Sequence, residues 1–265
     1  MKNRIVLAAA ALATLGWAGN ASADIAYNQD LTSNVIMGSG IGNGGFTTDR
    51  ANGIELGLRA RIPFIGSVNI SGPGTYSYDT TDIDSGGVGS WNFDWSVNSN
   101  YDGSGPGNLN TLTYLLEFDY DPTAGVTYYD FADLIPVLNG DPISIAYPND
   151  HSIGTNGTSE SGGSEATDAT NYFTLLATNN VLQNSWRGEW LLATPSATFD
   201  PYAPGTYNIR LSAFSGTTQK ASTEITVVIN GGGGPAVVPV PAAAPLGLLG
   251  MGLVAFVRRR KNAKA

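Results

Sequence analysis

Apolar and polar residues alternate with a period of two in several stretches of this chain, and this pattern limits the fold most strongly. In residues 54–62, Leu56 and Leu58 fall on one face of an extended chain, and Arg59 and Arg61 fall on the other. The same alternation recurs in three further stretches: 111–121, 207–212 and 225–229. A period of two is that of a half-buried β-strand, so the pattern predicts strands.

Glycine-rich connections separate these stretches, and helix signals are almost absent between them. The connections are residues 38–45, 71–74, 85–89, 103–107 and 154–163. Many short alternating strands joined by such turns predict an all-β fold, an antiparallel β-sandwich of the jelly-roll or immunoglobulin-like (Ig-like) type. We expect one such domain over residues 24–230, followed by a Gly/Pro linker at 231–237.

Residues 204–211, Pro-Gly-Thr-Tyr-Asn-Ile-Arg-Leu, resemble the penultimate strand of bacterial Ig-like and PKD-like modules. The resemblance implies that residues 221–230 form the closing strand. It also implies that Tyr207 lies at the corner position where such folds bond a tyrosine hydroxyl to the backbone. Many sandwiches share this segment, so it indicates architecture and not activity.

The N-terminal end has the three parts of a secretory signal peptide. Lys2 and Arg4 precede an apolar segment, residues 5–15, and the small-residue pattern Ala-Ser-Ala ends at Ala23. We predict cleavage between Ala23 and Asp24, so residues 1–23 are a signal peptide that takes no part in the fold.

The C-terminal end, residues 238–265, also has three parts. The first is a proline motif, made of Val238, Pro239, Val240 and Pro241. An apolar run follows at 242–257, and then a basic cluster of Arg258, Arg259, Arg260 and Lys261. About 17 residues at roughly 1.5 Å each give a helix of about 25 Å, short for a membrane span but sufficient. We predict a C-terminal transmembrane helix in the inner membrane, with its basic end on the cytoplasmic side.

This tail resembles the PEP-CTERM sorting signal of Gram-negative bacteria. The usual Pro-Glu-Pro reads Pro239-Val240-Pro241 here, closer to the Val-Pro-Leu-Pro variant of that signal. The resemblance implies that an exosortase, a membrane cysteine protease-transpeptidase, recognises the tail. It also implies delivery to the cell surface or to the exopolysaccharide matrix.

The region between the two ends is strongly acidic. All 22 Asp and Glu residues lie there with only six basic residues, a net charge of −16 (6 minus 22). Such a surface repels phosphate backbones, so we exclude nucleic acid as a partner, and divalent cations or basic partners suit it better. The chain has no cysteine and one histidine, His151, so it offers no parts for a nucleophile relay.

Three alternating carboxylates, Glu117, Asp119 and Asp121, share one face of a predicted strand. Jelly-roll glycosidases place acidic residues in the pattern Glu-x-Asp-x-x-Glu, and here the final position is Pro122. We therefore interpret the three as a solvated strand face that runs into an Asp-Pro turn, with no catalytic residue among them.

Asn98, Asn100 and Asp102 match the first oxygen ligands of a calcium loop, and Gly103 follows at position six. Position twelve of such a loop is a glutamate, and here it is Leu109. We interpret this segment as a flexible acidic turn without a metal or other cofactor, with calcium as the alternative. A second acidic loop contains Asp79, Asp82 and Asp84.

Aromatic residues form the last group of candidates. Trp91, Phe93 and Trp95 share one strand face, Trp186 and Trp190 lie further on, and Asn92 and Asp94 occupy the opposite, expected wet face. Aromatic planes can stack on sugars, but in a sandwich we expect them in the core. We therefore predict an exported, non-enzymatic surface or matrix protein linked to exopolysaccharide or biofilm matrix. The alternative is an extracellular carbohydrate-binding or carbohydrate-hydrolysing jelly-roll protein.

Overall fold

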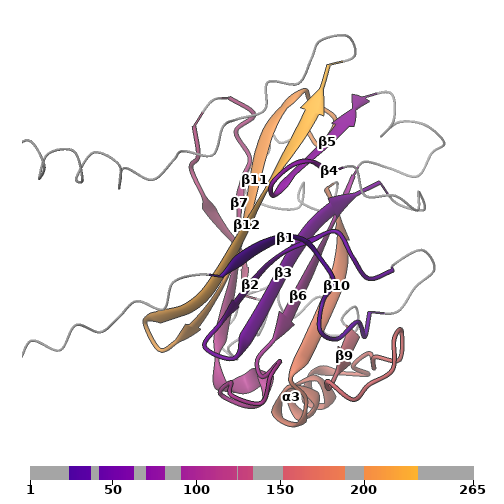
Figure 1. Ribbon diagram of the computed structural model, residues 1–265, viewed down its shortest axis with the longest axis vertical. Coiled ribbons are helices and arrows are strands. Elements are labelled where there is room, and N and C mark those ends of the chain that lie inside the picture. Colours follow the sequence, from indigo (N-terminus) through magenta and orange to yellow (C-terminus); the bar gives the residue numbers. More distant parts are fainter. Residues whose placement is uncertain are drawn as a thin grey trace, which may run out of the picture.

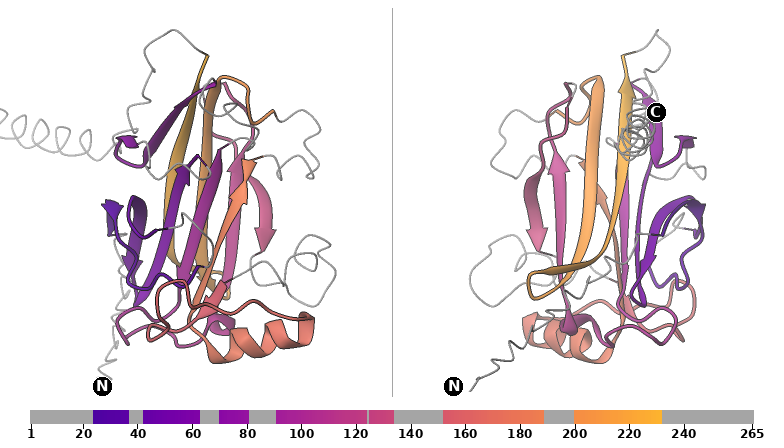
Figure 2. Two further views of the ribbon diagram at one scale, coloured as in Figure 1. Left: turned by 90° about the vertical axis from the view of Figure 1, so that its right-hand side faces the viewer. Right: turned by 60° about the vertical axis from the view of Figure 1, so that its left-hand side comes forward.

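The described strands of this protein assemble into two six-stranded sheets that pack face to face (Figures 1 and 2). The structure is a computed structural model, and it describes residues 24–36, 42–62, 70–80, 91–123, 125–133, 152–188 and 200–231. The predicted all-β sandwich is therefore confirmed.

Each sheet draws its strands from both halves of the sequence. In spatial order the first sheet contains β1 (Ile25–Gln29), β2 (Phe46–Ala51), β3 (Ile54–Arg61), β6 (Asn92–Asn98), β10 (Val181–Arg187) and β9 (Ser152–Gly154). The second contains β4 (Ile70–Gly72), β5 (Thr75–Asp79), β12 (Thr218–Asn230), β11 (Gly205–Ser215), β7 (Thr113–Asp119) and β8 (Tyr129–Asp133).

One strand pair departs from the predicted antiparallel arrangement. β5 runs parallel to β12, with Thr75 opposite Thr226 and Tyr78 opposite Ile229, whereas the other described pairs are antiparallel. A tight hairpin forces its two strands to be antiparallel, but β5 and β12 are distant in sequence, so no hairpin sets their relative direction.

The period-two pattern decides which side chains enter the core. Leu56 and Leu58 of β3, Leu116 of β7 and Ile209 of β11 are all fully buried between the sheets. Within the second sheet, Leu211 lies opposite Leu116. The strand faces predicted from sequence are thus the faces that the fold buries.

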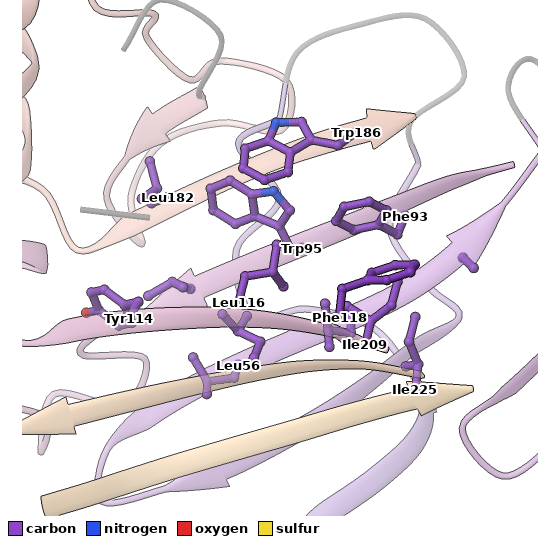
Figure 3. Close-up of a cluster of buried hydrophobic side chains, with 14 of the residues drawn as sticks. Leu56, Phe93, Trp95, Tyr114, Leu116, Phe118, Leu182, Trp186, Ile209 and Ile225 are labelled. Carbon is purple, nitrogen blue, oxygen red and sulfur yellow. The ribbon is translucent and has the colours of Figure 1, made fainter. Parts of the chain in front are cut away.

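Aromatic rings fill the middle of the sandwich (Figure 3). The ring of Trp91 stacks on Phe118 of the facing sheet, with centroids 6.1 Å apart and an interplanar angle of 12°. Trp95 and Trp186 meet edge to face at 5.5 Å, and Phe93 is fully buried beside them. The core interpretation is confirmed for Trp91, Phe93, Trp95 and Trp186, and these residues are not available to stack on a sugar.

A segment without regular structure, residues 31–36, lies across the outer face of the first sheet, and we call it the strap. Gln183 of β10 fastens it: its Nε2 donates to the Ser33 carbonyl at 2.7 Å, and its Oε1 accepts from the Val35 and Ile36 amides at 2.8 and 3.0 Å. The strap makes part of this face interior, although the alternation of residues predicted that it would face water.

A helix that the sequence analysis did not predict, α3 (Ala169–Thr178), closes one end of the sandwich (Figure 1). Asp168 caps its N-terminus by accepting a hydrogen bond from the Asn171 amide at 2.8 Å. Tyr172 and Leu176, one turn apart, are buried in the core. The short 3-10 helix η1 (Leu109–Thr111) lies next to α3.

Both predicted export segments lie outside the described residues. These are the signal peptide at 1–23 and the sorting tail at 238–265, which contains the predicted membrane helix. Within the part of the chain that the structure describes, no helix is long and apolar enough to span a membrane.

Candidate functional sites

The three predicted calcium ligands direct their oxygens at different protein donors. Asn98 Oδ1 accepts from Asn180 Nδ2 at 2.7 Å, and Asn100 Oδ1 accepts from the Gly105 amide at 2.8 Å. Asp102 Oδ1 accepts from the amide and hydroxyl of Ser104, at 2.9 and 2.7 Å. These bonds lower the pKa of the Asp102 carboxyl group. The oxygens thus stabilise the turn, and a shared calcium ion stays the untested alternative.

Asn156 connects this loop to the rest of the molecule, a role that sequence reasoning missed. Its Oδ1 accepts from Asn98 Nδ2 at 2.7 Å, from Asn180 Nδ2 at 2.9 Å and from Ser33 Oγ at 3.2 Å. Its Nδ2 donates to the Asn100 carbonyl at 2.8 Å. The sequence could not predict this network, because its members come from four separate parts of the chain and no local pattern links them.

The backbones of two loops touch at a pair of glycines nearby. A Cβ placed on Gly53, which has a φ of 72°, would lie 2.2 Å from the Gly105 nitrogen. The Tyr101 amide donates to the Gly53 carbonyl at 3.0 Å in the same contact. Any larger side chain at either position would separate the loops, so glycine here is a packing requirement.

The three alternating carboxylates have structural partners rather than a shared cleft. Glu117 forms two hydrogen bonds of 2.6 Å to the Arg210 guanidinium on the neighbouring strand β11. Asp119 is fully buried and accepts from the amides of Asp121 and Thr127 at 3.1 and 3.2 Å. Only Asp121 is exposed. The predicted solvated face is wrong for Glu117 and Asp119, because cross-strand and turn partners enclose them.

A buried ion triad lies on the outer face of the first sheet. Asp94 Oδ2 contacts the Nε atoms of Arg59 at 2.7 Å and Arg61 at 2.9 Å. All three side chains are at most 6% exposed. Arg59 also donates to the Gly44 carbonyl at 2.6 Å and lies 4.3 Å from the centroid of the Phe46 ring.

The expected wet face around Asn92 and Asp94 is therefore wrong: both residues are buried. Charges taken out of water need paired partners, and the triad supplies them. A buried triad whose members bond each other holds the strands β3 and β6 together.

The tyrosine corner implied by the Ig-like resemblance is present. Tyr207 Oη donates to the Ala203 carbonyl at 2.9 Å, four residues upstream. Burial raises the pKa of the Tyr207 hydroxyl to about 12, so it stays protonated and able to donate over the ordinary pH range.

The remaining candidates are only partly described. Asp79 is exposed at the end of β5, whereas Asp82, Asp84, His151 and Trp190 lie outside the described residues. Across the described ranges, no group of three or more His, Asp or Glu side chains is placed to hold a metal ion.

Comparison with known protein families, curated proteins and solved structures gives no match for this chain.

Proposed function

We propose that this chain is an exported Ig-like domain with a C-terminal sorting tail. The strand order supports the Ig-like type over the jelly roll. Ig domains arrange their strands as A-B-E-D and C-F-G. We name seven strands A to G in chain order: β3, β6, β7, β9, β10, β11 and β12. The order A-B-E-D then corresponds to β3-β6-β10-β9, and C-F-G corresponds to β7-β11-β12. Each set consists of neighbouring strands in that order within one sheet. Tyr207 then lies near the start of strand F, where the tyrosine corner belongs.

The proposal of export rests on where the folded domain lies in the chain, between the two predicted export segments. β1 begins at Ile25, two residues after Ala23, and β12 ends at Asn230, one residue before the predicted linker. A fold that needs residues 24–230 leaves the signal peptide free to be removed and the tail free to be read by a sorting enzyme. The expected partner is an exosortase-type enzyme, and the expected destination is the cell surface or the exopolysaccharide matrix.

We propose a non-enzymatic role, because the described candidates for chemistry are engaged in holding the fold. Glu117 pairs with Arg210, Asp119 stabilises a turn, and Asp94 neutralises two arginines. Glycoside hydrolysis needs two carboxyl groups that face a common substrate. The carbohydrate-hydrolysing alternative is therefore less well supported than a matrix or surface protein.

Localisation of charge variants in the native cell tests this proposal. In a triple variant, Arg258, Arg259 and Arg260 are each changed to Glu, which removes the positive charge that retains the tail on the cytoplasmic side. We expect the variant to lose membrane retention or surface delivery. Protease added to intact spheroplasts should digest residues 24–237 of the parent protein and spare Lys261 and Lys264 before processing.

The matched control changes the same three arginines to lysine, which keeps the charge. We expect this variant to localise as the parent does. Unaltered localisation of the glutamate variant would contradict the sorting proposal, whereas equal loss in both variants would show that arginine itself, and not charge, is read.

A further inference from the structure

Asp49 of β2 is a fully buried carboxylate that joins three strands. Its Oδ2 accepts a hydrogen bond from the Ser222 amide of β12 in the second sheet, at 2.8 Å. Its Oδ1 accepts from the amide of Asp24, the exposed residue just before β1, at 2.9 Å. The side chain therefore ties the beginning of the domain to both sheets.

This carboxylate has no cationic partner within the described residues. The neighbouring Arg50 contacts Glu55 instead, at 2.6 Å. Burial raises the pKa of Asp49, and the nearby Asp24 carboxylate adds to that rise, while the two amide hydrogen bonds oppose it. A buried anion held only by neutral amide donors is costly, since isolated charges are strongly disfavoured in the interior.

The donor at Oδ1 has a special place in the sequence. Asp24 is the residue predicted to follow the signal-peptide cleavage site, and its nitrogen belongs to the peptide bond that cleavage would break. Hydrolysis by a signal peptidase consumes one water molecule. The bond between the Ala23 carbonyl carbon and the Asp24 nitrogen breaks, Ala23 keeps a carboxylate, and the Asp24 nitrogen becomes an α-ammonium.

We propose that removal of the signal peptide creates the cationic partner of Asp49, the α-ammonium of Asp24, and so completes a partly buried ion pair that ties the residue before β1 to β2 and β12. The inference rests on the proposed export and adds a function for the cleavage position. The unprocessed chain has only an amide N–H at this place. The mature chain has a positive charge there, and charge-assisted hydrogen bonds are about twice as strong as neutral ones.

The pair can be tested on the chain 24–265, released from a cleavable fusion in detergent so that its free α-amino group belongs to Asp24. A matched chain carries Gly-Ser before Asp24, which moves the charge but leaves the amide N–H. We expect the extension to lower the melting temperature by about 2–4 °C. In the Asp49→Asn background, the extension should have almost no effect.

The α-amino pKa of the unmutated chain gives a readout that depends on no variant folding correctly. A free N-terminus titrates near about 7.7. Beside a buried carboxylate, the α-amino group of Asp24 should titrate above that value, because an opposite charge favours the charged form. Nuclear magnetic resonance of the ¹⁵N-labelled N-terminus measures this directly.

An ordinary α-amino pKa, or an equal melting-temperature loss with Asp49 and with Asn at that position, would overturn the ion pair. Sequencing of the N-terminus from the native cell separates this failure from failure of the proposed export. A native chain that retains residues 1–23 would refute the processing step, even if the released chain forms the pair.

Discussion

At the scale of single residues, the fold depends on a few buried charges that pair with one another. Asp94 is the clearest case, because its carboxylate pairs with both Arg59 and Arg61 on the covered face of the first sheet. Removing one member of a buried ion pair leaves an uncompensated charge, which costs more than the pair itself contributes.

We predict that Asp94→Ala lowers the free energy of unfolding by about 3–5 kcal/mol. Two buried arginine side chains would then lose the carboxylate that both of them contact. The control Asp121→Ala removes an exposed carboxylate, and we expect it to change the free energy by about 0.5 kcal/mol or less. Urea denaturation followed by tryptophan fluorescence measures both variants. Equal, small effects would mean that water reaches the triad.

Tyr207→Phe should lower the free energy of unfolding by about 1 kcal/mol, the net contribution of one hydrogen bond. The change leaves the ring in the core and removes the hydroxyl, which donates to the Ala203 carbonyl at 2.9 Å and lies 3.4 Å from the Asp200 carbonyl. Tyr27→Phe, which alters a hydroxyl on a 44% exposed residue, is the matched control. If the Tyr207→Phe protein is as stable as the parent, the hydrogen bond of the tyrosine corner does not stabilise the fold.

The pH dependence of stability follows from the same buried hydroxyls. Burial raises the pKa of Tyr76 and of Tyr207 from about 10 to about 12. A group with a raised folded-state pKa contributes stability that is present below its unfolded pKa and lost as pH rises through the folded value. We therefore expect the free energy of unfolding to fall between pH 10 and pH 12. Tyr207→Phe should lose less over that window, as chemical denaturation at several pH values can measure.

At the scale of elements, the alternation of apolar and polar residues predicts single strands, but it does not predict contacts between distant segments. Strand β3 and strand β7 were predictable, because a side-chain period of two and core burial coincide in both. The outer face of the first sheet was not predictable. Gln183 holds residues 35 and 36 against it, and these partners are nearly 150 residues apart in sequence.

Helix α3 was missed for a different reason. It is rich in threonine, which has a low helix propensity, and two of its residues, Thr174 and Thr178, bond carbonyls one turn back. Burial of Tyr172 and Leu176 and the Asp168 cap outweigh that propensity. Tertiary packing therefore decides this element.

We predict that Asp168→Ala lowers the free energy of unfolding by about 1 kcal/mol, the usual cost of losing an N-cap. Asp168→Asn retains an accepting oxygen and should be close to neutral. Hydrogen exchange of the Asn171 amide should accelerate in the alanine variant and stay slow in the asparagine variant. Identical exchange in both variants would contradict the capping role.

At the scale of the whole molecule, the excess of negative charge is the dominant property. A net charge of −16 over residues 24–237 (6 basic minus 22 acidic) opposes compaction, and cations that screen it should stabilise the fold. The described carboxylates are distributed over both sheets, and no group of three is placed to bind a metal within the described residues.

We therefore expect calcium, magnesium and sufficient monovalent salt to raise the melting temperature alike. Asp102→Ala should not alter the calcium response, because Asp102 Oδ1 already accepts two bonds from Ser104. A shift selective for calcium at micromolar to millimolar concentration, lost in Asp102→Ala, would instead establish the loop as a site by mass action.

The sequence predicted the sandwich and its core aromatics, since alternation and turn composition determine both. It did not predict the parallel β5–β12 pair, or the contacts that enclose Asp94, Asp119 and Glu117. Those features depend on which strands become neighbours, and neighbours are chosen by the packing of the whole chain. The candidate sites therefore changed from solvated carboxylates to structural partners.

The most direct test of the export account is intact-mass and peptide mass spectrometry of the protein recovered from its native cell. The account predicts a mature chain that begins at Asp24 and is found at the cell surface or in the matrix. A protein that still begins at Met1, or one that is confined to the cytoplasm, would contradict it.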